Sequence, residues 1–150
     1  MVREDTIVAI ATPPGEGAIG IVRVSGIQAL AVVAHLFRPQ ANRPTRPFEP
    51  YHVYHGALHH PLTGDLIDEV LLTTFRAPKS YTGEDVVEIS AHGSTVVLRA
   101  IVEACCDLQS SISKRSKDAA LSGLNPQSSI RLAEPGEFTL RAFLNGKLTL

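Results

Sequence analysis

The sequence predicts an α+β fold, a mixed β-sheet with about three helices. Two short runs near the N-terminus, TIVAIA (6–11) and IGIVRV (19–24), are apolar and rich in β-branched residues, as strands are. The segment 27–37 then carries apolar residues at helical spacing. With 150 residues, of which 44% are hydrophobic, the chain is long enough for one core-bearing domain.

The first two strands are expected to be joined by a loop that contains two prolines and a glycine. The helix over 27–37 is expected to follow Ser25, whose hydroxyl is a suitable N-cap. Residues 38–50 contain four prolines, so we interpret them as a surface connection.

The middle of the chain predicts an antiparallel hairpin. Its two strands are expected within YHVYHGALHH (51–60) and LIDEVLLTTFRA (66–77), on either side of the turn PLTGD. A loop over 78–85 then leads to a strand over 86–92. A helix is expected to begin near Ser94 and to continue through residue 108.

The C-terminal part combines a polar segment with a strand and a helix. Residues 109–130 are serine-rich and predict a mobile loop or insertion that contributes little to the core. The last twenty residues predict a strand, a Pro-Gly turn and a helix that buries Phe138, Ala142 and Phe143. We expect residues 1–145 to form the domain and residues 146–150 to begin a further helical domain.

Charge and composition narrow the function. A net charge of −1 and a pI near 6.6 provide no overall attraction to nucleic acid. The chain has no run of 18 apolar residues, and Glu4 and Asp5 stand where a signal peptide carries positive charge, which predicts a cytoplasmic protein. The adjacent Cys105 and Cys106 are expected to be reduced and packed in a helix.

Three glycines, Gly15, Gly17 and Gly20, fit the nucleotide-binding pattern G-x-G-x-x-G. In a dinucleotide-binding fold this loop opens a helix, whereas here a strand pattern follows it. No Gly-Lys-Ser/Thr occurs anywhere, so the chain has no phosphate-binding loop of GTPases. Two interpretations remain: the glycines let the backbone approach a flat ligand or a second subunit, or they only form a tight connection.

Two charged residues stand in apolar strands, Arg23 in IVRVS and Glu88 in VVEIS. Each is explained either by an ordinary surface position or salt bridge, or by contact with a ligand. Four clustered histidines, at positions 52, 55, 59 and 60, cannot share one coordination geometry on a strand and a turn, so no metal site is expected.

Three segments taken together resemble the N-terminal domain of the tRNA modification GTPase family, called MnmE or TrmE. They are DTIVAIATPPGEGAIGIVRVSG, SYTGEDVVEISAHGS and AEPGEFTLRAFLNGKLTL, in the family's order and along the whole chain. The resemblance implies a fold similar to the folate-binding domain of aminomethyltransferases, a bound reduced folate and a homodimer. The family's GTPase domain is not in this sequence.

The resemblance also implies that the full-length protein takes part in tRNA modification. The full-length family acts with the flavoprotein MnmG, or GidA, to modify C5 of the wobble uridine in certain tRNAs. A reduced folate such as 5-formyltetrahydrofolate supplies the one-carbon unit, and GTP, Mg²⁺ and K⁺ serve only the full-length protein. Tetrahydrofolate binding is carried over to Arg23, Glu88 and Lys147, with no catalytic residue. Glu88 would accept hydrogen bonds from the pterin amino edge, while Arg23 and Lys147 would meet ligand oxygens.

Two features depart from the family pattern. Glu16 stands where the family more often has a basic residue, and the segment 109–130 is longer than expected. Two other functions remain open. One is a free-standing folate-dependent one-carbon transferase, with His92 as its best acid or base. The other is a dimerisation module that binds no small ligand.

Overall fold

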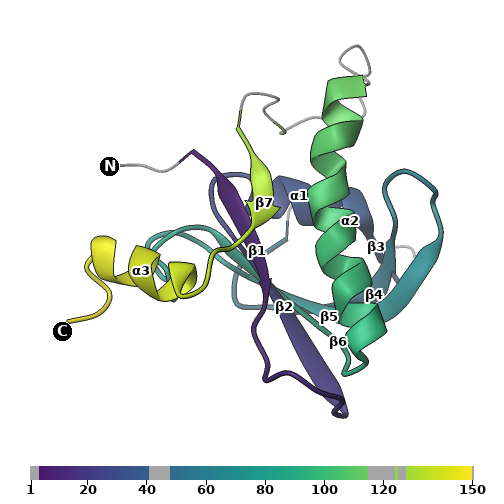
Figure 1. Cartoon of the computed structure of the whole chain (residues 1–150), viewed down its shortest axis with the longest axis horizontal. Coiled ribbons are helices and arrows are strands. Elements are labelled where there is room, and N and C mark those ends of the chain that lie inside the picture. The colour runs from purple at the N-terminus through teal and green to yellow at the C-terminus, as the bar shows by residue number, and fades with distance from the viewer. Residues whose placement is uncertain (1–3, 41–47, 115–123, 125–127, 150) are drawn as a thin grey trace.

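The computed structural model describes residues 4–40, 48–114, 124 and 128–149, and these form a seven-stranded mixed sheet with three helices (Figure 1). The α+β prediction is confirmed. The strand order is β3-β4-β5-β6-β2-β1-β7, and every pair is antiparallel except β1 with β7. The elements are β1 (Thr6–Ile10), β2 (Ile19–Ser25), α1 (Ala29–Leu36), β3 (Phe37–Pro39), β4 (Val53–His59), β5 (Leu66–Phe75), β6 (Val86–His92), α2 (Thr95–Lys114), β7 (Ile130–Leu132) and α3 (Glu137–Leu144).

Helices α1 and α2 cover one face of the sheet and enclose the core. Helix α2 presents an apolar stripe at helical spacing, Leu98, Ile101, Cys105 and Leu108, and all four side chains are buried. They pack in one cluster with alternate strand residues such as Val22. Gly20 permits this approach, because a Cβ there would lie 2.8 Å from Cδ2 of Leu98.

The opposite face of the sheet carries the charged strand residues. Strand pairing aligns five residues in one row across five strands, in the order Val53, Thr73, Glu88, Arg23 and Ala9. Because side chains alternate along a strand, this row points away from the core residues that flank it in each strand. Figure 1 shows α3 and α2 on opposite sides of β1 and β2, so α3 lies toward this second face.

The predicted strands and the hairpin are confirmed, and Gly20 lies within β2, so a strand and not a helix is found at the end of the glycine loop. The role given to Ser25 is wrong. Helix α1 begins at Ala29, and Ser25 ends β2 with its hydroxyl 2.7 Å from Thr82 Oγ1 and 2.8 Å from a Glu84 oxygen. Ser25 is therefore the last residue of a strand, although its type and position in the sequence are typical of a helix N-cap.

The predicted connection over 38–50 is shorter than expected at its start, since Phe37 opens β3 and this strand runs to Pro39. Residues 41–47 lie outside the described residues. Phe37 packs edge to face with Phe48, with ring centroids 5.6 Å apart. This aromatic contact closes the β3 edge of the core.

The prediction for 109–130 is wrong at both of its ends. Helix α2 extends to Lys114, because the helix continues beyond residue 108, where its apolar stripe ends and where the prediction ended it. At the other end, Ile130 is buried in the core and opens β7, and its N–H donates to the side chain of Gln109 at 3.1 Å. The parts of this segment at 115–123 and 125–127 lie outside the described residues.

Both cysteines are reduced and lie on α2, as predicted. Burial raises the pKa of Cys105 to about 12, so this thiol stays protonated at neutral pH. Within the described part of the chain, no helix has the length and apolar character that a membrane span requires.

We predict that Gly93→Ala destabilises the fold by about 1–3 kcal/mol. Gly93 and the glycine loop are joined by two backbone hydrogen bonds, Gly17 N–H to Gly93 O at 3.1 Å and Gly93 N–H to Ala18 O at 3.3 Å. A Cβ on Gly93 would lie 2.6 Å from the carbonyl carbon of Gly17, a backbone atom that cannot turn aside. Urea unfolding measures the change.

Gly17→Ala is the matched control for this prediction. It lies in the same contact, but its Cβ would find its nearest neighbour 3.8 Å away. Its unfolding free energy should stay within about 0.5 kcal/mol of the unsubstituted chain. Equal losses of unfolding free energy in the two variants would show that the close approach at Gly93 does not cause the destabilisation.

Candidate functional site

A pocket of about 520 Å³ opens on the second face of the sheet, between four separate segments of the chain. Residues 9–11 at the end of β1 form one side, and residues 132–139 around the start of α3 form another. Arg23 from β2 and Tyr81 from the loop between β5 and β6 complete the lining. A volume of this order suits a small organic ligand.

Arg23 and Glu88 form an ion pair beside this pocket. They are directly opposite on the paired strands β2 and β6, and Nε and Nη2 of Arg23 each lie 2.9 Å from Oε1 of Glu88. The two side chains are 29% and 27% exposed. Among the described residues, none bonds the second carboxylate oxygen of Glu88, which therefore retains acceptor capacity.

Tyr81 is the aromatic residue of the pocket, and it is fixed from two sides. The guanidinium carbon of Arg23 lies 5.8 Å from its ring centroid, within cation-π range. Its hydroxyl lies 3.1 Å from Oγ1 of Thr139 in the first turn of α3. Tyr81 remains 45% exposed, so part of its ring is available to a ligand.

The structure unites only part of the predicted site. Arg23 lines the pocket and Glu88 pairs with it, but neither Glu88 nor Lys147 is among the lining residues. Lys147 follows α3 with an exposed side chain, and its N–H donates to Ala142 O at 2.8 Å. The three glycines of the loop do not line the pocket either.

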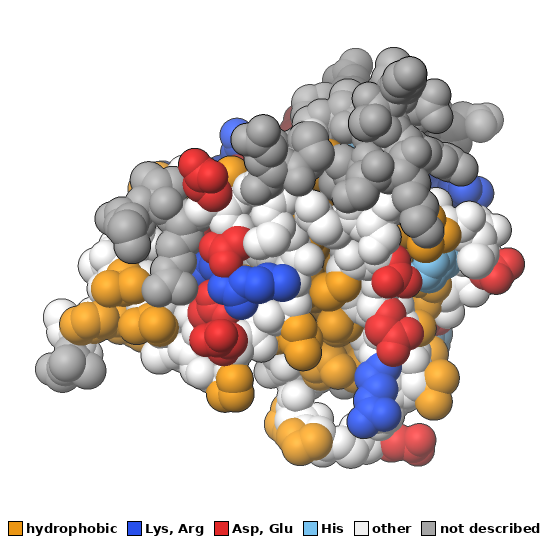
Figure 2. Space-filling view, turned by 45° about the horizontal axis from the view of Figure 1, so that its top comes forward, with side chains coloured by type: hydrophobic (Ala, Val, Ile, Leu, Met, Phe, Trp, Pro, Cys, Tyr) orange, Lys and Arg blue, Asp and Glu red, His pale blue; other side chains and the backbone are white. Residues whose placement is uncertain are grey.

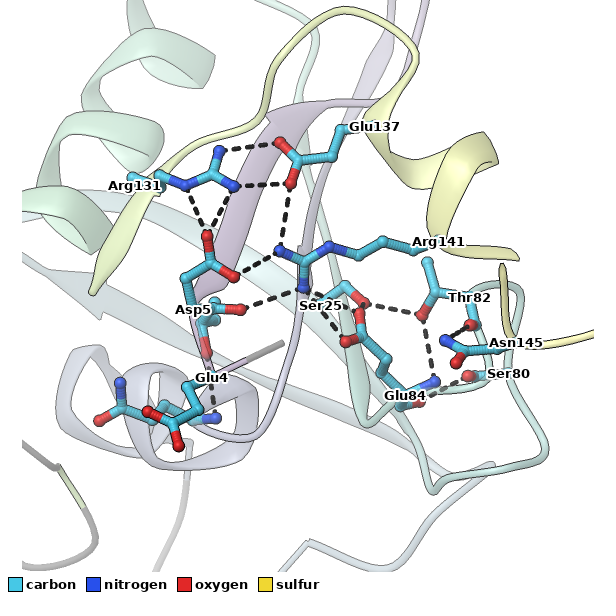
Figure 3. A network of polar contacts seen from close by, with 12 residues as sticks. Glu4, Asp5, Ser25, Ser80, Thr82, Glu84, Arg131, Glu137, Arg141 and Asn145 are labelled. Carbon is cyan, nitrogen blue, oxygen red and sulfur yellow. Dashed lines mark hydrogen bonds and ion pairs between the residues drawn. The ribbon is translucent and has the colours of Figure 1, made fainter. Parts of the chain in front are cut away.

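Behind the pocket lies a cluster of charged side chains that the sequence reasoning missed (Figure 3). Arg141 of α3 is 1% exposed and forms ion pairs with Asp5, Glu84 and Glu137. Arg131 of β7 bonds both oxygens of Glu137, at 2.8 and 2.7 Å, and also pairs with Asp5. The two arginines thus share two carboxylates, while Glu84 contacts Arg141.

Ion pairs therefore hold helix α3 against the rest of the domain. The predicted burial of Phe143 is wrong. The buried residues of α3 are Glu137, Arg141 and Ala142, whereas Phe143 is 41% exposed and Phe138 is half-buried in the pocket lining. Hydrophobic side chains gather at the α3 end of the surface in Figure 2. The available sequence signal was Glu137 and Arg141, an opposite-charge pair with the four-residue spacing of one helix face.

The arginines set the protonation of their partners. Hydrogen bonds from Arg131 lower the pKa of Glu137 to about 2, against the opposing effect of burial and with help from the Glu134 N–H and from Arg141. Burial would raise the pKa of Asp5, but the hydrogen bond and charge of Arg131, together with the charge of Arg141, hold it below its ordinary value. Both carboxylates are therefore ionised at neutral pH.

Glu137→Gln should lower the free energy of unfolding by roughly 3 kcal/mol above pH 5. The folded pKa of Glu137, about 2, lies below its ordinary 4.5, so its contribution is complete above 4.5 and disappears as the pH falls toward 2. Unfolding curves at several pH values should show the variant and the unsubstituted chain converging in that range. Glu134→Gln, at an exposed carboxylate of the same turn, is the control and should change little. A gap that persists unchanged at pH 2 would contradict the assignment.

The described residues contain no group of three or more His, Cys, Asp or Glu side chains that could hold a metal ion. His92 has a carboxylate partner, since its Nδ1 lies 2.9 Å from Asp68 Oδ1, but it is 74% exposed and lies outside the pocket lining. The pocket lining offers a ligand one guanidinium, two aromatic rings, two carboxylates and main-chain groups.

Comparison with known proteins identifies the family. The family model described as "GTP-binding protein TrmE N-terminus" matches residues 6–147. Proteins described as "tRNA modification GTPase MnmE" from Carboxydothermus hydrogenoformans and Syntrophus aciditrophicus are 45% and 44% identical over 147 residues, 98% of this chain. A protein of the same description from Symbiobacterium thermophilum is 46% identical over 147 residues.

The match covers only part of those relatives. The chain spans 28% of the Carboxydothermus and Symbiobacterium proteins and 27% of the Syntrophus protein. It corresponds to the portion that the family model calls the N-terminus. The chain therefore belongs to the TrmE N-terminus family, the family of the tRNA modification GTPases MnmE.

Proposed function

We propose that this chain is the folate-binding and dimerisation part of a cytoplasmic tRNA modification GTPase. The observation that carries the proposal is the Arg23–Glu88 ion pair beside a pocket of about 520 Å³, in a chain of this family. The pair joins the two strand residues that the family resemblance assigns to folate.

The ligand in this proposal is a reduced folate such as 5-formyltetrahydrofolate. The oxygen of Glu88 that no described residue bonds would accept a hydrogen bond from the amino edge of the pterin. Arg23 would face a ligand oxygen, and the exposed part of Tyr81 provides an apolar surface for a flat ring. Lys147 would meet the carboxylates of the ligand at the outer end of the site.

In the complete protein, this domain would present the one-carbon unit for modification at C5 of the wobble uridine, together with the flavoprotein MnmG. GTP hydrolysis with Mg²⁺ and K⁺ would belong to the part of the protein beyond this chain. The near-neutral charge of the chain agrees with a division in which other parts of the complex hold the tRNA. A free-standing transferase that uses His92 has less support, because His92 does not line the pocket.

Homodimerisation has an available surface on the second face of the sheet. Val53 and Leu71 are 63% and 47% exposed on strands β4 and β5. Leu71 is aligned with Ser90 and Ile21, next to the row that contains Arg23 and Glu88. Exposed apolar side chains around a polar pair are suited to burial against a second copy.

Titration calorimetry with 5-formyltetrahydrofolate tests the ligand. We expect saturable binding of about one folate per chain, weakened at least about tenfold by Arg23→Ala or Glu88→Ala, which corresponds to about 1.4 kcal/mol. Glu69→Ala is the matched control, because Glu69 pairs across strands with His55 away from the pocket. Unchanged affinity in both site variants would remove the assignment, and a folded dimer that binds no folate would favour a ligand-free module.

Sedimentation equilibrium tests the dimer. Leu71→Asp should raise the dimer dissociation constant by about tenfold or more, because it places a charge in the buried surface. Leu66→Asp is the control, since Leu66 is 62% exposed at the hairpin end of the same strand. A monomeric unsubstituted chain, or equal effects of the two variants, would contradict this surface.

A further inference from the structure

Arg141 lies outside the pocket but bonds residues in or next to three of the segments that line it. The pocket is bounded by the end of β1, by Tyr81 of the loop before β6, and by the first turn of α3. Arg141 bonds Asp5, which directly precedes β1, and Glu84, three residues after Tyr81. It also bonds Glu137, the first residue of α3.

The guanidinium makes these contacts simultaneously. Nη1 donates to the main-chain oxygen of Asp5 at 3.0 Å and to both oxygens of Glu84 at 3.1 Å. Nη2 donates to Oδ1 of Asp5 at 3.0 Å and to Oε2 of Glu137 at 3.1 Å. Because the donors of a guanidinium are held in one plane, they fix the relative positions of the three segments.

The loop that carries Tyr81 is linked to these bonds through Glu84. Glu84 accepts from Arg141 and from the Ser25 hydroxyl, and its main-chain oxygen accepts from the hydroxyl of Ser80, the residue before Tyr81. Asn145, four residues beyond Arg141, donates from Nδ2 to Thr82 O at 2.7 Å. With the Tyr81–Thr139 contact, the loop is thereby attached to the segment that includes α3 at three points.

Arg131 provides an internal comparison. It contacts Asp5 and Glu137, the same two carboxylates that Arg141 contacts. Among the contacts described for Arg131, none reaches Glu84 or the loop of Tyr81. The two arginines therefore differ in the link to this loop.

We propose that Arg141 is a positioning residue of the pocket, which holds Tyr81 against α3 through Glu84 so that the aromatic wall is formed before a ligand arrives. Preformed walls lower the ordering cost of binding, so loss of this link should weaken the ligand. The effect on folate affinity rests on the proposed function, whereas the effect on the loop does not depend on any ligand.

The test compares Arg141→Lys with Arg131→Lys by native-state hydrogen exchange and by titration of 5-formyltetrahydrofolate. Each variant keeps its charge and loses the guanidinium fork. Arg141→Lys should accelerate exchange across 81–85 by at least about tenfold and weaken folate by about tenfold. Arg131→Lys should leave exchange in that loop and folate affinity within about twofold, even where it lowers stability.

Glu84→Gln provides a second variant that leaves the bonds of Arg141 to Asp5 and Glu137 in place. It should reproduce the faster loop exchange if Arg141→Lys does not fold. Equal loop exchange in the two arginine variants, or an unchanged loop in Glu84→Gln, would overturn the proposal. If the unsubstituted chain binds no folate, the proposed function fails, and the exchange pattern still decides the role of Arg141.

Discussion

The burial of Arg141 among carboxylates is the constraint on which the second face of the sheet depends. A buried charge must be paired, because removal from water costs several kcal/mol per ion. Arg141 meets this requirement with Asp5, Glu84 and Glu137, which come from the start of the chain, the loop before β6 and α3. Any displacement of one segment leaves charge unpaired, so the cluster specifies one arrangement of the three.

Different interactions stabilise the packing on the two faces of the sheet, apolar burial on one and ion pairs on the other. The face under α1 and α2 is apolar and buried, and it gains its stability from the removal of hydrocarbon from water. On the other face, α3 has a short buried surface dominated by charge, and Leu140, Phe143 and Leu144 stay exposed. Hydrogen bonds are directional, so they hold the pocket side in a defined geometry, where a small apolar contact would allow sliding.

The sequence was most informative where periodicity governs structure. Alternation and helical spacing located the central strands, the hairpin and α2, because burial on one face enforces these patterns. It was least informative where distant residues decide, as at Ser25, whose hydroxyl joins Thr82 and Glu84 across strands, and at Arg141, whose partners lie up to 136 residues away. Arg23 and Glu88 could be singled out as unusual strand residues, but their pairing follows from a register that only the fold defines.

The position of β1 has a consequence for synthesis. This first strand lies between β2 and β7, and Arg141 of α3 bonds Asp5, so β1 is held by elements that are more than 100 residues away in sequence. While the ribosome is still adding residues 93–130, β1 has one hydrogen-bonding edge open to other chains. Completion of the sheet therefore waits for β7, and the pocket, which needs α3, forms only after that.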